Sequence, residues 1–469
     1  MEIFSKSILL IIGAIFSLGL ANFGILSIQE KEKRAARISF GGATFGAALF
    51  FLAASQPTST RVTLLSILGI LGIIFIILFF LPIGKIKLEN DIPRSRFNER
   101  EIMFARANLK SGTPNYESYY KLHPEHKGID DRTREKAGLL SPQAKFFDPL
   151  LFTAPNASFA LTGALREAVD GAVAPEKQLF APEEISPYLK ELARYYGALD
   201  VGITDLEPYH IYSHTGRGAG VYGAPIELDH QYAIALTVEM DHEMMGDAPH
   251  APVVMESAKQ YVESARAAIQ VANVIRSLGY AARAHIDGNY QVIAPLVVRD
   301  AGLGEFGRMS LLMTPNEGPR VRVGVVTTDM PLVADPRTPD LATIGFCNIC
   351  KKCADNCPSK SIPFDGREEN DGALRWRIDP EGCFAYWCVI GTDCGRCMTV
   401  CPFSHPDNAA HNLVRWGIAR SGFFRRLALW LDDLFYGREP AHRSAPAWTR
   451  GFSSTKKGDK SSNSSFIIK

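Results

Sequence analysis

The chain lacks a dominant charge, an export signal and cysteines outside one short segment. Its 469 residues carry a net charge of only +1, so no bulk electrostatic field favours binding to nucleic acid. No twin-arginine motif precedes the first apolar stretch and no small-residue cleavage site follows it, which argues against a removed signal peptide. All nine cysteines lie between positions 347 and 401 in paired rows, an arrangement that is poor for a disulfide framework.

The cysteines form two rows with related spacing. Residues 347–358 read C-x2-C-x2-C-x3-C-P, and residues 394–402 read C-x2-C-x3-C-P. This is the spacing of a bacterial two-cluster ferredoxin, in which three cysteines of a row ligate one cluster and the fourth ligates the other. A pair of zinc sites is the alternative, because C-x2-C pairs also bind zinc, but the C-P endings favour iron–sulfur clusters. We therefore expect one-electron transfer.

Two 4Fe-4S clusters require eight cysteine ligands, so one of the nine cysteines is spare. The first cluster is assigned four ligands by the spacing: Cys347, Cys350, Cys353 and Cys401. The second cluster takes Cys357, Cys394 and Cys397, together with either Cys383 or Cys388.

Three apolar stretches, residues 7–28, 38–54 and 62–83, open the chain. A membrane span needs about 20 apolar residues, so the first and third qualify and the second is marginal. If all three cross, both loops rich in Lys and Arg lie on one side, which the positive-inside rule places in the cytoplasm. We therefore expect a multi-pass protein of the cytoplasmic membrane with its large domain facing the cytoplasm. That orientation fails if residues 38–54 do not cross.

Six parts follow from composition: a transmembrane region (1–84), a linker or extended arm (85–150), a core (151–339), a two-cluster module (340–407), a helical segment (408–452) and a disordered tail (453–469). Within the core, periodicity predicts helices at 183–197 and 255–278. It predicts strands at 199–204, 232–240, 281–286, 291–298 and 321–328. Helices alternating with strands indicate an α/β or α+β core.

Gly302, Gly304 and Gly307 match the G-x-G-x-x-G pattern of dinucleotide-binding loops. The match is weak by itself, and Pro315 interrupts the helix that such a loop should open. A tight turn that brings backbone near a large ligand is the favoured interpretation.

Several motifs in order resemble the cobalamin-dependent reductive dehalogenases. They are residues 301–308 (AGLGEFGR), 313–315 (MTP), 318–322 (GPRVR) and 328–332 (TDMPL), followed by the two cysteine rows. The likeness covers roughly residues 185–440. Many members of that family carry a twin-arginine signal and pair with a separate membrane anchor, whereas here the anchor is fused at the N-terminus.

The resemblance implies a corrinoid-binding α/β (α+β) core with a ferredoxin-like module holding two 4Fe-4S clusters. The corrinoid would be cobalamin with its lower base detached, in keeping with the lack of a D-x-H-x-x-G motif. The C-x3-W pattern of the family selects Cys383 over Cys388 as the ligand. The turn implied to contact the cofactor comprises Gly302, Gly304, Glu305, Gly307 and Arg308.

The resemblance also implies a catalytic trio of Tyr261, Arg322 and Asn289, with Arg308 and Arg320 as rivals of Arg322. A phenol has a pKa near 10, and a nearby guanidinium should lower that pKa and ease proton delivery. Asn289 would orient the substrate or the halide.

The predicted function is thus replacement of halogen by hydrogen on an organohalide, with electrons from a ferredoxin, a flavodoxin or a quinol-linked protein. One alternative is a corrinoid and iron–sulfur reductase similar to epoxyqueuosine reductase, for which a basic surface would be expected. The other is a membrane ferredoxin that only relays electrons, which would need no core.

Overall fold

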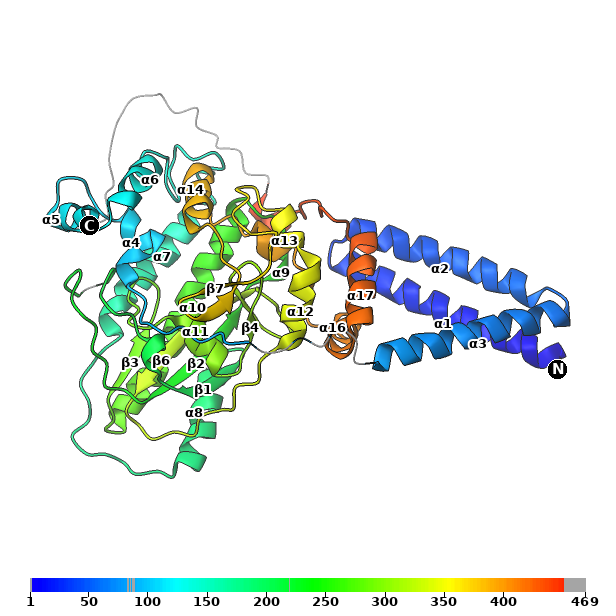
Figure 1. The fold of residues 1–469 in the computed structure, drawn as a ribbon, viewed down its shortest axis with the longest axis horizontal. Coiled ribbons are helices and arrows are strands. Elements are labelled where there is room, and N and C mark those ends of the chain that lie inside the picture. Colours follow the sequence, from blue (N-terminus) through cyan, green and yellow to red (C-terminus); the bar gives the residue numbers. More distant parts are fainter. Residues whose placement is uncertain (1, 82–83, 85, 87–88, 219, 451–469) are drawn as a thin grey trace.

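The computed structural model describes residues 2–81, 84, 86, 89–218 and 220–450. The predicted disordered tail, 453–469, lies outside the described residues. Three long helices project from one side of a larger body that contains the core and the cysteine-rich module (Figure 1). The chain therefore separates into an apolar arm of three helices and a body that contains the sheet and the cysteines.

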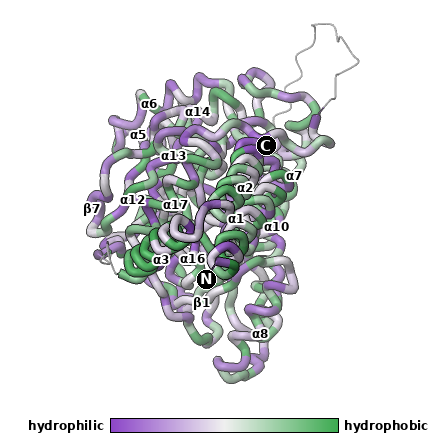
Figure 2. Tube along the Cα trace, turned by 90° about the vertical axis from the view of Figure 1, so that its right-hand side faces the viewer, coloured by the Kyte–Doolittle hydropathy of each residue, from purple (hydrophilic) through white to green (hydrophobic). Residues whose placement is uncertain are grey.

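The arm consists of α1 (Glu2–Gln29), α2 (Lys33–Ala54) and α3 (Thr58–Phe80), each long and apolar enough to cross a membrane. The marginal second stretch begins five residues earlier than predicted and so reaches 22 residues. Helices α1 and α2 approach closely through glycines: a Cβ at Gly46 would lie 2.6 Å from the Phe16 ring. All three helices are hydrophobic along most of their length (Figure 2).

The core is a four-stranded sheet in the order β1-β2-β6-β3, with every neighbouring pair antiparallel. The strands are β1 (Val201–Asp205), β2 (Tyr232–Glu239), β3 (Ala282–His285) and β6 (Val321–Thr328). Ile234 and Leu236 belong to one apolar cluster and Ala233 and Ala235 to another, as the two-residue period of a strand requires.

Helices cover both faces of this sheet. Helices α8 (Pro182–Tyr195) and α10 (Ala251–Ser277) pack on one face, and α11 (Ala294–Asp300) packs on the other. Four of the five predicted strands and both predicted helices are present within a few residues. The antiparallel pairing makes the core α+β, which is one of the two predicted classes.

The predicted strand at 291–298 is wrong, because residues 294–300 form α11. Pro295 lies in its first turn, where a missing N–H costs nothing and the fixed φ suits a helix. An apolar run this short fits a buried strand and a buried helix equally well, so its period could not decide.

The predicted extended arm, 85–150, contains three helices: α4 (Met103–Ala107), α5 (Pro114–Leu122) and α6 (Pro124–Arg134). Its polar composition gave no indication of a small aromatic core, in which Tyr116, Tyr119 and Tyr120 are buried together. The sequence also contains the N-cap of α5. Thr113 directly precedes Pro114, and its side chain accepts a hydrogen bond from Tyr116 N.

The cysteine-rich part joins the core to the apolar arm. Its elements are α12 (Leu341–Cys350), α13 (Lys352–Asp355), β7 (Glu368–Asn370), β8 (Ala373–Arg375), α14 (Pro380–Ile390) and α15 (Arg396–Thr399). The predicted helical segment is two helices, α16 (Ala409–Arg420) and α17 (Gly422–Phe435), with Ser421 capping the second. Helices α16 and α17 both contact α12 on one side, while α17 contacts α2 and α3 and α16 contacts α3 on the other.

Two further α-helices and one short hairpin belong to the body: α7 (Thr153–Leu165), α9 (His242–Gly246), and β4 (Glu305–Phe306) paired with β5 (Leu312–Met313). Helix α7 lies against α10, and α9 lies between α10 and α15.

Arg106 ties residues 85–150 to the cysteine-rich part. It is 2% exposed, and its guanidinium lies 2.7 Å from Asp130 and 2.8 Å from Glu381 of α14. Arg106→Met should leave the Asp130 carboxylate buried and unpaired, costing about 3–5 kcal/mol. Hydrogen exchange of the α4 and α6 amides should therefore accelerate strongly. Lys127→Met, which removes an exposed ion pair with Asp131, is the matched control, and equal exchange in both variants would contradict this role.

Candidate functional site

The four cysteines assigned to the first cluster line a single hollow. Cys347 and Cys350 come from α12, Cys353 from α13, and Cys401 from the turn after α15. Phe346, Phe403 and Met309 surround them with apolar surface. Burial raises the pKa of the Cys347 thiol to about 11 and that of Cys353 to about 12, so iron is needed to hold them as thiolates.

The cysteines assigned to the second cluster also lie together. Cys357, Cys383 and Cys394 act electrostatically on one another, and all three act on the partly buried Cys397. Cys394 and Gly395 both have positive φ, 58° and 67°, which turns the chain sharply between the ligands. Burial has the largest effect on the Cys383 thiol and raises its pKa to about 11.

Cys388 lies apart from both groups. It is 5% exposed and packs in an apolar cluster with Met103 and Phe384. Among the described residues, Lys136 is the charge that acts on its thiol, whereas Cys383, five residues earlier on α14, lies near Cys357. The geometry thus groups Cys383, rather than Cys388, with the second set.

Tyr261 and Arg322 meet above the sheet. Tyr261 lies on α10 and Arg322 on β6, and the guanidinium carbon lies 4.9 Å from the centroid of the phenol ring. Arg322 Nη2 donates to Ser257 Oγ, one turn before Tyr261 on α10, at 2.5 Å. It also lies 3.3 Å from Asp393 Oδ2, the neighbour of Cys394. The pair therefore adjoins the second cysteine group.

The expected lowering of the Tyr261 pKa is not found. Burial raises this pKa, and the Arg322 cation opposes burial without overcoming it. The phenol thus stays protonated at neutral pH, while the guanidinium is placed to stabilise the phenolate after the proton has left. Arg320, one rival of Arg322, instead pairs with Glu239 and donates to the Ser404 and Met240 carbonyls.

Asn289 is buried in the turn after β3, but both ends of its amide are engaged. Its Oδ1 accepts from Arg283 Nη2 at 2.8 Å, and its Nδ2 donates to the Arg166 carbonyl at 3.1 Å. It lines a cavity of about 390 Å³ together with both arginines. A role in orienting the substrate stays a prediction.

The glycine-rich turn lies against the first cysteine group. A Cβ at Gly307 would lie 2.9 Å from Met313 and 3.6 Å from Cys347 Sγ, and one at Gly304 would lie 2.4 Å from the Met313 carbonyl. Gly302 has φ +80°. Arg308 donates to the carbonyls of Cys347, Pro363 and Asp365. The turn thus lies against the residues assigned to the first cluster, and its contact with a corrinoid stays a prediction.

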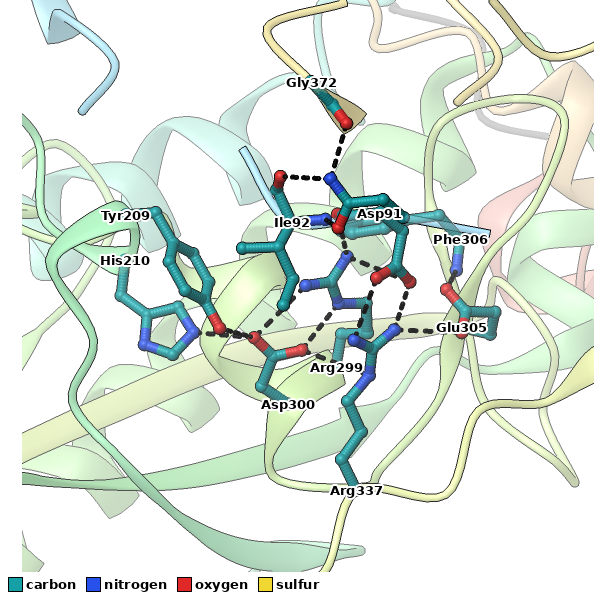
Figure 3. Close-up of polar contacts among 11 residues, drawn as sticks. Asp91, Ile92, Tyr209, His210, Arg299, Asp300, Glu305, Phe306, Arg337 and Gly372 are labelled. Atoms are coloured by element: carbon teal, nitrogen blue, oxygen red, sulfur yellow. Dashed lines mark hydrogen bonds and ion pairs between the residues drawn. The ribbon is translucent and has the colours of Figure 1, made fainter. Parts of the chain in front are cut away.

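Glu305 belongs to a buried ionic network (Figure 3). Its carboxylate lies 3.6 Å from Arg337, which also pairs with Asp91 and Asp300. His210 and Tyr209 complete the network by bonding to Asp300 at 2.9 Å and 2.8 Å. Glu305 therefore lies beside one arginine of the network, while its Oε2 accepts no hydrogen bond from the described residues.

Sequence reasoning missed the polar groups around Tyr261. Asp287 and Arg217 come from loops and act electrostatically both on Tyr261 and on Tyr290, and Tyr261 also acts on Tyr290. Asp393 could have been found, since it precedes a predicted ligand, Cys394. Loop residues without a motif gave no comparable signal.

Two buried atoms indicate that a further polar group fits beside the pair. Arg322 Nε and Asp393 Oδ1 have no hydrogen-bond partner among the described residues. Buried polar atoms are rarely left unpaired, so this position suits a cofactor rich in amides, as a corrinoid is.

Comparison with known proteins begins with the cysteines. Residues 346–405 match the family model of the 4Fe-4S dicluster domain. The chain is 35% identical over 291 residues to a tetrachloroethene reductive dehalogenase of Sulfurospirillum multivorans, covering 55% of this chain and 58% of the relative. It is 31% identical to one of Desulfitobacterium hafniense, covering 50% of each. The chain spans only about half the length of these curated relatives.

Solved structures agree. A catabolic reductive dehalogenase matches with a TM-score of 0.62 and 26% identity over 76% of this chain and 49% of that one. A second structure, titled as suggesting a mechanism for B12-dependent dehalogenation, matches with a TM-score of 0.60 and 25% identity over 80% and 54%. The curated proteins also include an epoxyqueuosine reductase of Pseudomonas aeruginosa, 25% identical over 55% of this chain and 80% of the relative.

These matches confirm the resemblance read from the sequence and the predicted fold. They also support the predicted cofactors, two 4Fe-4S clusters and cobalamin.

The positions of Cys383 and Cys388 on α14 predict that their serine variants retain different amounts of iron. Cys388→Ser should keep about eight irons per chain, because its side chain faces apolar residues. Cys383→Ser should lose up to half of the iron, because one cluster then lacks a ligand. Iron and sulfide analysis of anaerobically purified protein measures this. A reversed pattern would exchange the two assignments.

Proposed function

We propose that this chain, a relative of the reductive dehalogenases, is a membrane-anchored enzyme that replaces a halogen of an organohalide by hydrogen. The observation that carries the proposal is the contact between Tyr261 and Arg322 beside Asp393, the residue before Cys394. A proton donor, a cation and the second cluster thereby meet at one place. A protein that only relays electrons would need neither the core nor this pair.

The reaction consumes two electrons and one proton for each halide released. Cobalamin, when bound, supplies the cleavage of the carbon–halogen bond. Tyr261 supplies the proton from its hydroxyl, and burial keeps that hydroxyl protonated until the product needs it. Arg322 stabilises the phenolate that remains and is itself oriented by Ser257 and Asp393. Burial of the pair also limits access of water to the reacting centre.

Electrons enter through the first cluster and leave through the second. Cys347 and Cys350 lie on α12, which packs on α16 and α17 next to the apolar helices. The second cysteine group lies next to Asp393 and Arg322. The electron donor is a ferredoxin, a flavodoxin or a quinol-linked protein that meets the first cluster.

A deoxygenase similar to epoxyqueuosine reductase is the second candidate, because the chain covers 80% of one such enzyme. A tRNA substrate would require a basic surface, and the net charge here is only +1. The three apolar helices also have no use in binding tRNA. Cobalamin-loaded protein that acts on modified tRNA and releases no halide would favour this candidate.

The apolar helices hold the catalytic body at the cytoplasmic face of a membrane. The turn between α1 and α2 lies against the body, since Glu30 bonds to His411 at 3.0 Å and Glu32 pairs with Arg443 at 2.7 Å. This turn and the start of α2 carry Lys31, Lys33, Arg34 and Arg37. Positive residues stay in the cytoplasm, so the body lies there too.

Helices α16 and α17 lie across the ends of the apolar helices (Figure 1). Phe79 of α3 packs on Trp416 and Phe424, with ring centroids 5.4 Å apart in both pairs. Trp416 and Trp430 are 46% and 60% exposed, and aromatic side chains of this kind favour the interface between lipid and water. The pair of helices α16 and α17 thus marks the plane of the membrane surface.

A topology experiment tests the orientation. A fluorescent reporter fused after the last residue should be bright in the cytoplasm, and an alkaline phosphatase fused there should be inactive. Replacing Lys31, Lys33, Arg34 and Arg37 by Gln should weaken this bias, because the positive charges set it. An active phosphatase on the unaltered chain would overturn the assignment.

Halide release tests the proton donor. Tyr261→Phe removes the hydroxyl and keeps the ring, so iron and cobalamin should be retained. Release under saturating reductant should fall by about 100-fold or more. Arg322→Lys keeps the charge but loses the planar fork, so it should retain more activity than Arg322→Met.

Tyr195→Phe, at a tyrosine 83% exposed, is the matched control and should behave as wild type. Wild-type release by cofactor-replete Tyr261→Phe would show that the proton comes from elsewhere.

A further inference from the structure

The apolar arm meets the body at a group of two histidines and one glutamate. Glu30 lies in the turn between α1 and α2, and His411 lies in the first turn of α16. His405 comes from the cysteine-rich part, four residues after Cys401. Each of the three side chains offers one ligand atom, and these atoms lie within 4.8 Å of one another. We call Glu30, His405 and His411 the junction group.

The carboxylate of Glu30 is buried without a Lys or Arg beside it. Its side chain is 7% exposed, and His411, 8% exposed, is its sole ion-pair partner among the described residues. His411 Nε2 lies 3.0 Å from one carboxylate oxygen and 3.1 Å from the other. Asn408 Nδ2 adds a hydrogen bond of 2.9 Å, but its amide is neutral. A buried carboxylate needs a compensating charge, which a bound cation would supply.

At least one of the two imidazole rings is neutral. The rings of His405 and His411 stack with centroids 4.5 Å apart and planes 11° apart, and two imidazolium cations at that separation would repel each other. Burial holds the pKa of His405 well below its usual value, and the neighbouring His411 lowers it further. His405 is therefore the neutral ring, which is the form of histidine that binds a metal.

Several polar atoms around His405 have no partner. His405 Nδ1 is buried and makes no hydrogen bond within the described part of the chain, and the same holds for the hydroxyl of Tyr436, whose ring packs on His405 at 4.2 Å. A second carboxylate, that of Asp432, lies 3.6 Å from His405 Nε2. Buried polar atoms are rarely left unpaired, so these atoms indicate a missing polar ligand such as a hydrated ion.

We propose that the junction group binds one divalent transition cation, Zn²⁺ or Fe²⁺, which ties the apolar arm to the cysteine-rich part. Two imidazoles and a carboxylate are ligands that both ions accept. Metal–ligand bonds of about 2.0–2.2 Å place the ligand atoms roughly 3.4 Å apart, so the side chains need to close by about 1 Å. Asp432 or a water completes the shell. The inference is independent of the reaction proposed above, since the ion joins elements of the fold.

Metal analysis tests the site. Full-length, cobalamin-loaded protein in lipid nanodiscs is purified anaerobically, incubated with Zn²⁺ or Fe²⁺ and freed of loose ions on a chelating resin. Wild type should hold about eight cluster irons together with one zinc or a ninth iron. Glu30→Gln and His411→Gln should keep the cluster irons, but their Kd for the additional ion should weaken by about 100-fold or more.

A second group of the same composition provides the matched control. His123, Glu125 and His126 also lie close together, but Glu125 is 61% exposed and therefore well solvated without an ion. His123→Gln should keep the additional ion. Absence of an additional ion from wild type, its persistence in both junction variants, or its loss from His123→Gln instead overturns the proposal.

X-ray absorption at the zinc edge needs no variant, so it decides the question even if the junction variants fail to fold. Zinc-loaded wild type should show nitrogen and oxygen neighbours at about 2.0–2.2 Å, with imidazole scattering. Sulfur neighbours at about 2.3 Å would place the zinc among the cysteines and contradict the assignment.

Hydrogen exchange tests whether the ion ties the arm to the body. With free Zn²⁺ at about ten times its Kd, exchange of the amides in the turn at 30–33 should slow by about tenfold in wild type and should not change in Glu30→Gln. A contact that depended only on the hydrogen bond between His411 and Glu30 would not respond to Zn²⁺. Unchanged exchange in zinc-loaded wild type would overturn the tying role.

Discussion

The contact between Arg322 and Asp393 joins the two halves of the body. Arg322 stands on the last strand of the core sheet to appear in the sequence, β6, and Asp393 directly precedes a cysteine of the second group. The same guanidinium covers the ring of Tyr261. One side chain thereby contacts the sheet, the proposed proton donor Tyr261 and the cysteine-rich part. We call this contact the seam. Arg322 Nε and Asp393 Oδ1 are buried there and have no hydrogen-bond partner within the described chain, so both atoms are available to bond with a polar cofactor.

The remaining architecture connects this seam to the apolar arm. Helix α10 carries Tyr261 and packs on the sheet, while α12 carries two cysteines of the first group and packs on α16 and α17. Those two helices in turn contact the apolar arm through Phe79 and its aromatic neighbours. The first cysteine group therefore lies on the side of the apolar arm, and the second lies beside Arg322 and Asp393.

Much of this could be predicted from sequence because the signals are local. The spacing of the cysteine rows fixed the two ligand groups, and the long apolar period of α10 and the β-branched run of β6 fixed the elements that carry Tyr261 and Arg322. The helix α11 was missed because an apolar run of seven residues suits either structure. The helices of residues 85–150 were missed because their stability comes from buried tyrosines and from Arg106 binding a residue 275 positions away.

The electrostatics of the site could not be predicted from the sequence. Proximity of Arg322 suggested a lowered Tyr261 pKa, but burial is the larger effect and only the folded chain reveals it. Asn289 carries the expected amide, yet Arg283 and a carbonyl already engage it. Arg308 lies in the expected turn, but it donates to the Cys347 carbonyl, and Glu305 lies 3.6 Å from Arg337. Each difference arises from side chains that are distant in sequence and meet only in the fold.

The central claim is that electrons pass through the second cluster to the seam beside Tyr261. The most direct test counts electrons and halide together in cobalamin-loaded protein supplied with a reduced donor. Wild type and Cys388→Ser should release one halide for every two electrons consumed, and Cys383→Ser, with cobalamin still bound, should release almost none. Undiminished, donor-driven halide release by Cys383→Ser would contradict the account.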